Sequence, residues 1–189
     1  MTADASLLFE PTNRTRCSAI IETLNRFGPD AIAFAVRCGT RIVPLCAEQR
    51  YDEASTALKR LRVDVDAWPA PPAGLFVVEE RTVYLRSHSA MTVAHEFGHA
   101  LDCALGGGIY RSGVDPHLRR LFAAAAAFVT PYAATGADEY FAESVRAYVE
   151  INDPASFWPR ATRARLRRVD PGMYAYVADL FSNGFTVAA

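Results

Sequence analysis

Two histidines and a glutamate in the middle of the chain have the spacing of a metal-binding motif. In the segment His95-Glu96-Phe97-Gly98-His99 the histidines lie four residues apart. If this segment is helical, both imidazoles project from one face, about 6 Å apart along the axis, and both can reach one tetrahedral zinc ion. Glu96 then lies beside the metal, where a carboxylate can take a proton from an activated water and deliver it to a leaving group. The motif therefore predicts metal-assisted hydrolysis.

A catalytic zinc ion needs a third protein ligand, and several residues near the motif are poor candidates. Cys103 shares the helix face, but it lies about 12 Å from His95 along the axis, too far to share the ion. Asp102 could accept the N–H of a ligating imidazole, although an ordinary exposed helix acid is an equally good interpretation. His88 and His117 lie outside the motif helix and are not selected as ligands.

Three glutamates of a later helix remain as candidates for the third ligand: Glu139, Glu143 and Glu150. Glu139 and Glu143 lie four residues apart and share one helix face, next to an apolar stripe. Two acids in this arrangement repel each other unless a positive group lies near them. Zinc with its histidines would supply that charge for Glu139, and a histidine or an arginine would supply it for Glu143. A solvated acidic edge is the alternative interpretation.

The elements around the motif must hold these side chains in place. The apolar spacing predicts a helix from about Ala90 to Leu105, which Ser87 or Ser89 can cap and which three consecutive glycines end. Before it, the runs Leu75–Val78 and Thr82–Leu85 predict a hairpin. Either strand, if exposed, could accept an extended peptide by strand addition.

The N-terminal third of the chain alternates between helical and strand patterns. Apolar spacing predicts helices over Arg14–Phe27 and Tyr51–Leu61, and short apolar runs predict strands over Ala31–Val36 and Arg41–Cys46. Pro44 would place the second of these strands at a sheet edge or at a bulge. A proline-rich loop or linker then leads to the hairpin.

The chain after the motif reads as helical throughout. Cap and proline signals predict helices over about 116–129, 138–151, 162–168 and 171–181, with Asp138 as the cap of the second. We therefore expect an α+β fold, with a mixed α/β N-terminal part that carries a small sheet and a mostly helical C-terminal part. The length of 189 residues suits one domain. We divide it into an N-terminal part (1–74), a catalytic core (75–151) and C-terminal helices (152–189).

Composition gives little indication of a charged partner. The net charge is −1, so there is no global bias toward nucleic acid, acidic lipid or acidic substrates. The one basic cluster, Arg160–Arg168, lacks interleaved aromatic residues and is typical of a solvated helix face. Nucleic-acid binding is therefore not expected, while docking of an acidic protein partner to this cluster stays open.

Cysteine usage and the apolar segments bear on the compartment. The four cysteines include no C-x-x-C pair, and free buried thiols are favoured over a Cys38–Cys46 bridge, which would need neighbouring strands. The N-terminus lacks the charge and the apolar region of a signal peptide, and no run of about 18 apolar residues occurs. These features predict a cytoplasmic protein without a membrane partner, and they leave non-classical export open.

The motif and its downstream partners resemble a known group of zincin metallopeptidases. The segment His95–Asp102, followed by Tyr132 and then by Glu139-Tyr140-Phe141-Ala142-Glu143, is similar to the catalytic domain of anthrax lethal factor and to the related Pro-Pro endopeptidases. Regulatory bacterial zinc peptidases of the Mlc-titration-factor type also look similar. The resemblance covers roughly residues 75–150 and leaves the choice of substrate open.

The resemblance implies a zincin-like fold and a role for each matching residue. Zinc would be held by His95, His99 and Glu139, with Glu143 supporting a ligating histidine. Tyr132 would face the substrate carbonyl, where a phenol can donate to the developing oxyanion, although an aromatic packing residue is the alternative.

The expected function is zinc-dependent hydrolysis of a protein or peptide substrate, with Glu96 as general base. The alternative is a zinc-binding regulatory or partner-binding protein with little or no turnover. The intact Glu96 argues against that alternative, because a protein without turnover has no chemical need for the base.

Overall fold

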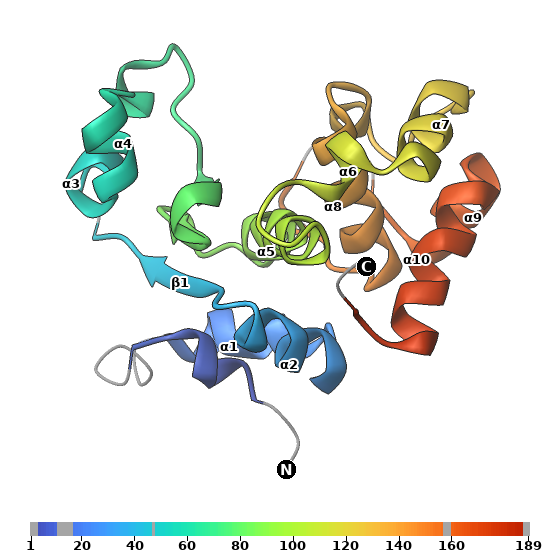
Figure 1. The fold of residues 1–189 in the computed structure, drawn as a ribbon, viewed down its shortest axis with the longest axis horizontal. Coiled ribbons are helices and arrows are strands. Elements are labelled where there is room, and N and C mark those ends of the chain that lie inside the picture. The colour runs from blue at the N-terminus through green and yellow to red at the C-terminus, as the bar shows by residue number, and fades with distance from the viewer. Residues whose placement is uncertain (1–3, 11–16, 47, 157–159, 187–189) are drawn as a thin grey trace.

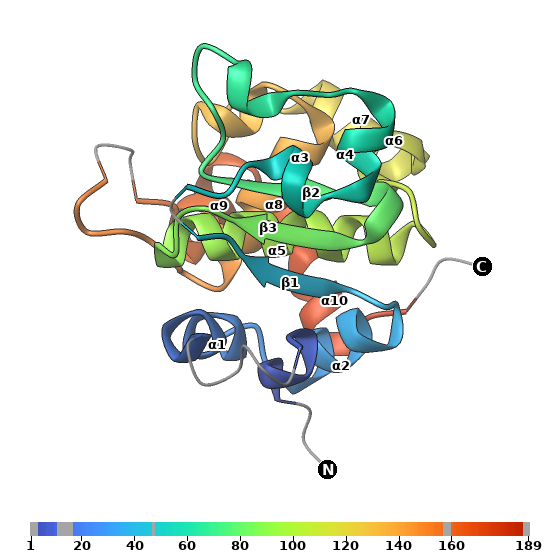
Figure 2. The same ribbon diagram turned by 90° about the vertical axis from the view of Figure 1, so that its left-hand side faces the viewer.

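A small sheet with helices on both faces organises the N-terminal half of the protein. The computed structural model describes residues 4–10, 17–46, 48–156 and 160–186. In this part of the chain the strands are β1 (Arg41–Pro44), β2 (Gly74–Val77) and β3 (Thr82–Leu85). Their order is β1-β3-β2, with β1 parallel and β2 antiparallel to β3 (Figure 2). The predicted hairpin is therefore present, and β2 and β1 are the outer strands.

Side chains alternate between the two faces of the sheet, as strand geometry requires. Phe76, Val83 and Leu85 belong to the main hydrophobic core, which contains the helix α5 (Ala90–Leu105). Val77 and Tyr84 belong to a smaller cluster on the other face. That second face is covered by α3 (Tyr51–Ala54) and α4 (Thr56–Leu61), which Figure 1 shows on the far side of the strands from α5. The sheet therefore lies between the motif helix and a separate pair of short helices.

The segment predicted as a strand over Ala31–Val36 is instead a helix. Helix α1 (Ser18–Asn25) is followed by α2 (Pro29–Arg37), and both pack in the main core. Gly28 precedes α2 with φ of 84° and Pro29 occupies its first turn, which are favourable features for a helix start. The strand prediction was wrong, because the apolar run was too short to distinguish the side-chain period of a helix from that of a strand.

Two further helix boundaries differ from the prediction. Ser55 ends α3 and caps α4, because its hydroxyl accepts the Leu58 N–H, so the predicted single helix is two. Helix α7 (Pro116–Ala124) ends earlier than the alanine run suggested, and Phe128 beyond it packs its ring near Phe122 at a centroid distance of 5.7 Å.

The remaining helices form the C-terminal layer. They are α6 (Arg111–Val114), α8 (Ala137–Tyr148), α9 (Arg163–Val169) and α10 (Pro171–Asn183). Short 3₁₀ helices occur at Ala5–Leu8, Val65–Ala67, Val78–Glu80 and Tyr132–Ala134. Gly136 occupies the cap of α8, so Asp138 lies in the first turn and is not the cap that the sequence suggested. Among the described helices, none has the length and apolar character needed to cross a membrane.

The motif helix α5 has the predicted bounds and packs closely on α8. Ser89 caps it by accepting the Thr92 N–H, and Gly106 ends it. The two helices are in close contact where Gly98 meets Ala142, since a β-carbon placed at Gly98 would lie only 2.8 Å from Ala142 Cα. A side chain at position 98 would therefore force the helices apart.

Replacing Gly98 by alanine tests this contact. We expect Gly98→Ala to lower the free energy of unfolding by about 1–3 kcal/mol, because overpacking outweighs the higher helix propensity of alanine. Gly113→Ala is the matched control and should be neutral or stabilising, since a β-carbon there meets no atom of the described residues within 4 Å. Urea denaturation of the three proteins measures both effects, and equal stability of the two variants would contradict the packing argument.

Candidate metal centre

Three side chains from two helices converge at the contact between α5 and α8. His95 and His99 lie one turn apart on α5, and Glu139 comes from the first turn of α8. The Nε2 atoms of the two histidines are 3.1 Å apart, and Glu139 Oε2 lies 3.0 Å from His95 Nε2 and 3.4 Å from His99 Nε2. These residues form a group that could hold a metal ion.

The distances among these atoms fit a tetrahedral metal site. With metal–ligand bonds of about 2.0–2.1 Å, tetrahedral geometry separates two ligand atoms by about 3.3–3.4 Å. The observed separations of 3.0–3.4 Å are close to that edge length. Glu139 Oε2 is also buried, and it has no hydrogen-bond partner among the residues that the structure describes. Lone-pair atoms this close repel each other unless a proton or a cation lies between them, so the donor set suits a divalent cation.

The charges around the histidines also favour a positive charge at this site. Burial alone would lower the pKa of His95, but its contacts with Glu139 and Glu143 raise that pKa to about 10. Burial would raise the pKa of Glu139, yet the two histidines bring it down to about 2. The carboxylates therefore favour a positive charge at this point, which either a proton on His95 or a metal ion can supply.

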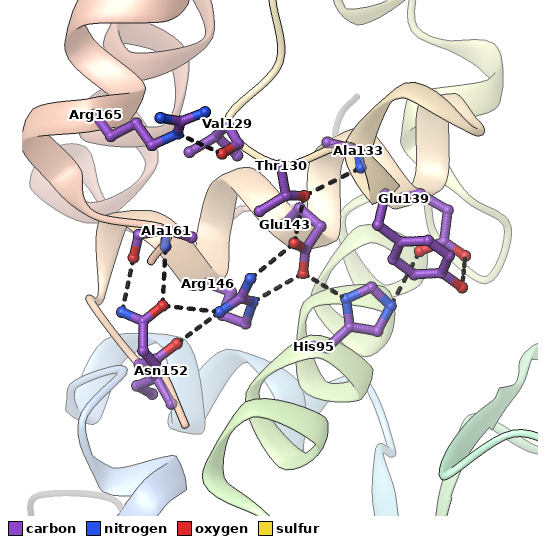
Figure 3. Close-up of polar contacts among 12 residues, drawn as sticks. His95, Val129, Thr130, Ala133, Glu139, Glu143, Arg146, Asn152, Ala161 and Arg165 are labelled. Carbon is purple, nitrogen blue, oxygen red and sulfur yellow. Dashed lines mark hydrogen bonds and ion pairs between the residues drawn. The ribbon is translucent and has the colours of Figure 1, made fainter. Parts of the chain in front are cut away.

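Glu143 contacts the opposite ring nitrogen of His95. Its Oε1 lies 3.0 Å from His95 Nδ1, while Thr130 Oγ1 donates to its Oε2 at 2.6 Å (Figure 3). Arg146 donates to both carboxylate oxygens at 2.8 Å. Burial would raise the pKa of Glu143, but the hydrogen bonds from Arg146 and His95 hold it far below its usual range. An ionised carboxylate therefore accepts from the Nδ1–H of His95, which leaves Nε2 to face the metal site.

Glu96 and Tyr132 line one cleft together with His95. Glu96 is 7% exposed, and burial raises the pKa of its carboxyl group. Tyr132 is 43% exposed, and its hydroxyl donates to Glu139 Oε1 at 3.1 Å. Its ring centroid lies 5.4 Å from that of His95. A buried carboxylate with a raised pKa and a phenol at the rim are groups that can accept and donate protons beside a metal ion.

A cleft of about 270 Å³ opens beside these residues. Its lining comes from the start of β2, the first half of α5, Tyr132 and α8. The lining residues are Pro72, Ala73, Gly74, Met91, Thr92, His95, Glu96, Tyr132, Glu143 and Arg146. Gly74 is needed at this point, because a β-carbon there would lie 2.6 Å from Glu96 Cγ. The first residue of β2 is therefore in close contact with the base candidate of the motif.

Other residues considered as ligands or supports have different partners. Asp102 does not pair with a histidine: both of its carboxylate oxygens accept from Ser112, at 2.9 Å from the backbone N–H and 2.5 Å from the hydroxyl. Cys103 lines a separate cavity of about 230 Å³ with Cys38. The Glu150 side chain accepts the Arg163 N–H. The structure thus brings together the motif residues, Tyr132, Glu139 and Glu143, and it leaves these others outside the centre.

The remaining histidines and cysteines also lie apart from the centre. His88 and His117 are exposed. All four cysteines are free, and Cys46 is exposed, which differs from the expectation of buried thiols.

Arginines of the basic cluster have structural partners. Arg163 stacks over the Tyr148 ring at 4.2 Å and donates to the Tyr148 carbonyl, and Arg165 donates to the Val129 carbonyl at 2.8 Å. These guanidinium groups tie α9 to the end of α8 and to the segment before Tyr132.

Two groups near the centre were not identified as site residues from the sequence. Arg146 is three residues after Glu143 on α8, and this spacing was the one available signal for the pairing. Tyr110, whose ring centroid is 5.6 Å from that of His99, follows a glycine-rich turn, and no local pattern connects it to the motif.

Comparison with known proteins bears on the fold. No family model and no curated protein matches this chain. Among solved structures, the chain is similar to a Pro-Pro endopeptidase from Paenibacillus alvei, with a TM-score of 0.64 and 21% sequence identity. The match covers 93% of this chain and 98% of the endopeptidase chain. The α+β zincin-like fold is therefore confirmed, whereas the resemblance to lethal factor and to the Mlc-titration-factor type stays a prediction.

Metal binding should stabilise the folded protein through this centre. At a free cobalt or zinc concentration 100 times the dissociation constant, binding to the native state adds about 2.7 kcal/mol, which raises Tm by about 5–10 °C. His99→Ala should abolish the shift, whereas His88→Ala, an exposed histidine outside the centre, should retain it. Thermal unfolding with and without metal measures this, and an equal shift in both variants would place the metal elsewhere.

Proposed function

We propose that this protein is a zinc-dependent peptidase that hydrolyses peptide bonds in a protein or peptide substrate. The convergence of His95, His99 and Glu139, with Glu96 beside them, carries this proposal. The set has two imidazoles and one carboxylate, which is the ligand type of catalytic zinc sites that keep a position open. The fold shared with a Pro-Pro endopeptidase supports the proposal.

Each residue has a defined role in this proposal. The two histidines and Glu139 would hold a zinc ion, which would supply Lewis acidity and lower the pKa of water to near 7. The Glu96 carboxylate accepts a proton from the attacking water and later delivers it to the leaving amine. Its burial raises the pKa of the carboxyl group, which makes the carboxylate a stronger base toward the attacking water.

Tyr132 is the proposed donor to the oxyanion. Its hydroxyl donates to Glu139 Oε1 in the structure, and its partial exposure lets it turn toward a substrate carbonyl. Hydrogen bonds that form as charge develops on the carbonyl oxygen lower the barrier.

The sheet order favours β2 as the strand that would receive the substrate. β3 is paired on both sides, whereas β2 is an outer strand. The cleft lies at the Gly74 end of β2 and includes His95 and Glu96. An extended peptide could therefore add to β2 by main-chain hydrogen bonds. Because one similar solved structure is that of a Pro-Pro endopeptidase, peptides with consecutive prolines are a sensible first group in a substrate library.

Glu96→Gln tests the role of the base. The amide cannot accept a proton, so we expect kcat to fall by about 10²–10⁴-fold while zinc stays bound, because Glu96 is not a ligand. Cleavage of a peptide library by mass spectrometry, together with zinc content, measures this. Glu79→Gln, an exposed glutamate on the hairpin, is the control. Bound zinc without any cleavage by the wild-type protein would instead favour a zinc-binding regulatory protein.

Tyr132→Phe tests the oxyanion donor. Because the ring packing is retained and only the hydroxyl is lost, we expect kcat to fall by about 10²–10³-fold with a small change in KM. Tyr174→Phe on α10 should leave both constants unchanged. A Tyr132→Phe variant with wild-type kcat would show that Tyr132 is a packing residue.

A further inference from the structure

A buried ion pair lies directly behind the metal centre. Arg146 is 2% exposed, and its Nε and Nη2 donate to the two oxygens of Glu143, each at 2.8 Å. Such a bidentate pair has a fixed geometry. Burying two charges gains little net stability over apolar side chains, so the pair calls for a role other than stability.

The third nitrogen of the Arg146 guanidinium group also has hydrogen-bond partners. Its Nη1 donates to the Ile151 carbonyl at 2.9 Å and to Asn152 Oδ1 at 3.2 Å. Asn152 in turn accepts the Ala161 N–H and donates to the Ala161 carbonyl, each at 2.9 Å (Figure 3). The guanidinium group is thus fixed by a turn after α8 and, through Asn152, by the segment before α9.

The Glu143 carboxylate has contacts that leave it one orientation. Oε1 contacts Arg146 and His95 Nδ1, and Oε2 accepts from Arg146 and Thr130. A rotation of the carboxylate would break several charge-assisted hydrogen bonds at once. The plane of the His95 ring is therefore set by a carboxylate that cannot readily move.

The two histidines differ in this support. His95 Nδ1 contacts Glu143, whereas His99 Nδ1 is buried and has no hydrogen-bond partner among the described residues. The polar network behind the centre consequently acts on one ligand, His95. A loss of that network should loosen the metal site without removing any ligand.

We infer that Arg146 is a positioning residue for the metal centre: it fixes Glu143, which orients the His95 imidazole, and Asn152 holds Arg146 in place. The inference rests on the proposed function in taking the centre as a zinc site. It concerns the affinity for the ion, so it can be tested without any substrate. Lysine cannot replace Arg146, because an ammonium group does not offer two parallel donors to a carboxylate.

The experiment compares zinc affinity among folded variants. Zinc dissociation constants from chelator competition should rise by about 10–100-fold in Arg146→Lys and Arg146→Met, the range seen when partners of metal ligands are lost. Asn152→Ala should also raise the zinc dissociation constant, but by a smaller factor. Arg165→Lys is the matched control, because Arg165 donates to the Val129 carbonyl nearby and lysine can still do so.

A double-mutant cycle separates positioning from general stability. If Arg146 acts through Glu143, Arg146→Met should lower zinc affinity in the wild-type background and add no loss in the Glu143→Gln background. In the double variant Arg146→Met/Glu143→Gln neither partner of the ion pair is charged. Its zinc affinity can therefore be compared with that of Glu143→Gln even if Arg146→Met alone does not fold. The visible spectrum of bound cobalt should change in Arg146→Lys and remain as wild type in Arg165→Lys.

Each outcome has a definite meaning. Wild-type zinc affinity in folded Arg146→Lys, equal losses in the Arg146 and Arg165 variants, or additive losses in the cycle would overturn the inference while leaving the proposed function standing. A wild-type protein that binds no zinc would overturn both.

Discussion

The contact between Gly98 and Ala142 constrains the geometry of the candidate metal centre. On α5, Gly98 lies between the two motif histidines, and on α8, Ala142 lies between Glu139 and Glu143. The helices can approach closely because neither position carries a large side chain, and a β-carbon at Gly98 would already clash with the α8 backbone. The separations of 3.0 and 3.4 Å between Glu139 Oε2 and the two histidine Nε2 atoms span this contact, so a change in helix spacing would alter them.

Charge compensation divides the two acids of α8 between different partners. Glu143 is neutralised by Arg146 on its own helix and supports His95, whereas Glu139 faces the histidine pair. Without a bound cation, the carboxylates of Glu139 and Glu143 raise the pKa of His95, because they favour a positive charge on its ring. A divalent ion would supply that charge instead, so metal and proton compete for the same lone pairs. The network is therefore suited to a cation. Arg146 neutralises Glu143, so Glu139 is the acid that faces the histidine pair.

Local sequence signals predicted the motif helix and the hairpin well, because caps, glycines and periodic apolar residues act over a few positions. The same signals failed at Ala31–Val36, where a short apolar run fits both a strand and a helix. They also could not assign a partner to Asp102, which binds Ser112 beyond a glycine-rich turn. Glu139 was one of three glutamates that the residue pattern allowed as the third metal ligand, and only the resemblance to known metallopeptidases selected it. Contacts between distant segments decide such cases, and no local pattern encodes them.

The sheet order bears on a question that the sequence left open, namely which strand of the hairpin could pair with a peptide. Both strands of the hairpin could have accepted a peptide, but β3 is central and β2 is an outer strand. The first residue of β2, Gly74, packs on Glu96, so the strand and the proposed base are held together by direct contact. A larger residue at this position would push the strand away from α5 and change the cleft and the environment of Glu96 together. Substrate placement and proton transfer would therefore share one packing constraint, which ties the N-terminal half of the chain to the chemistry of the motif.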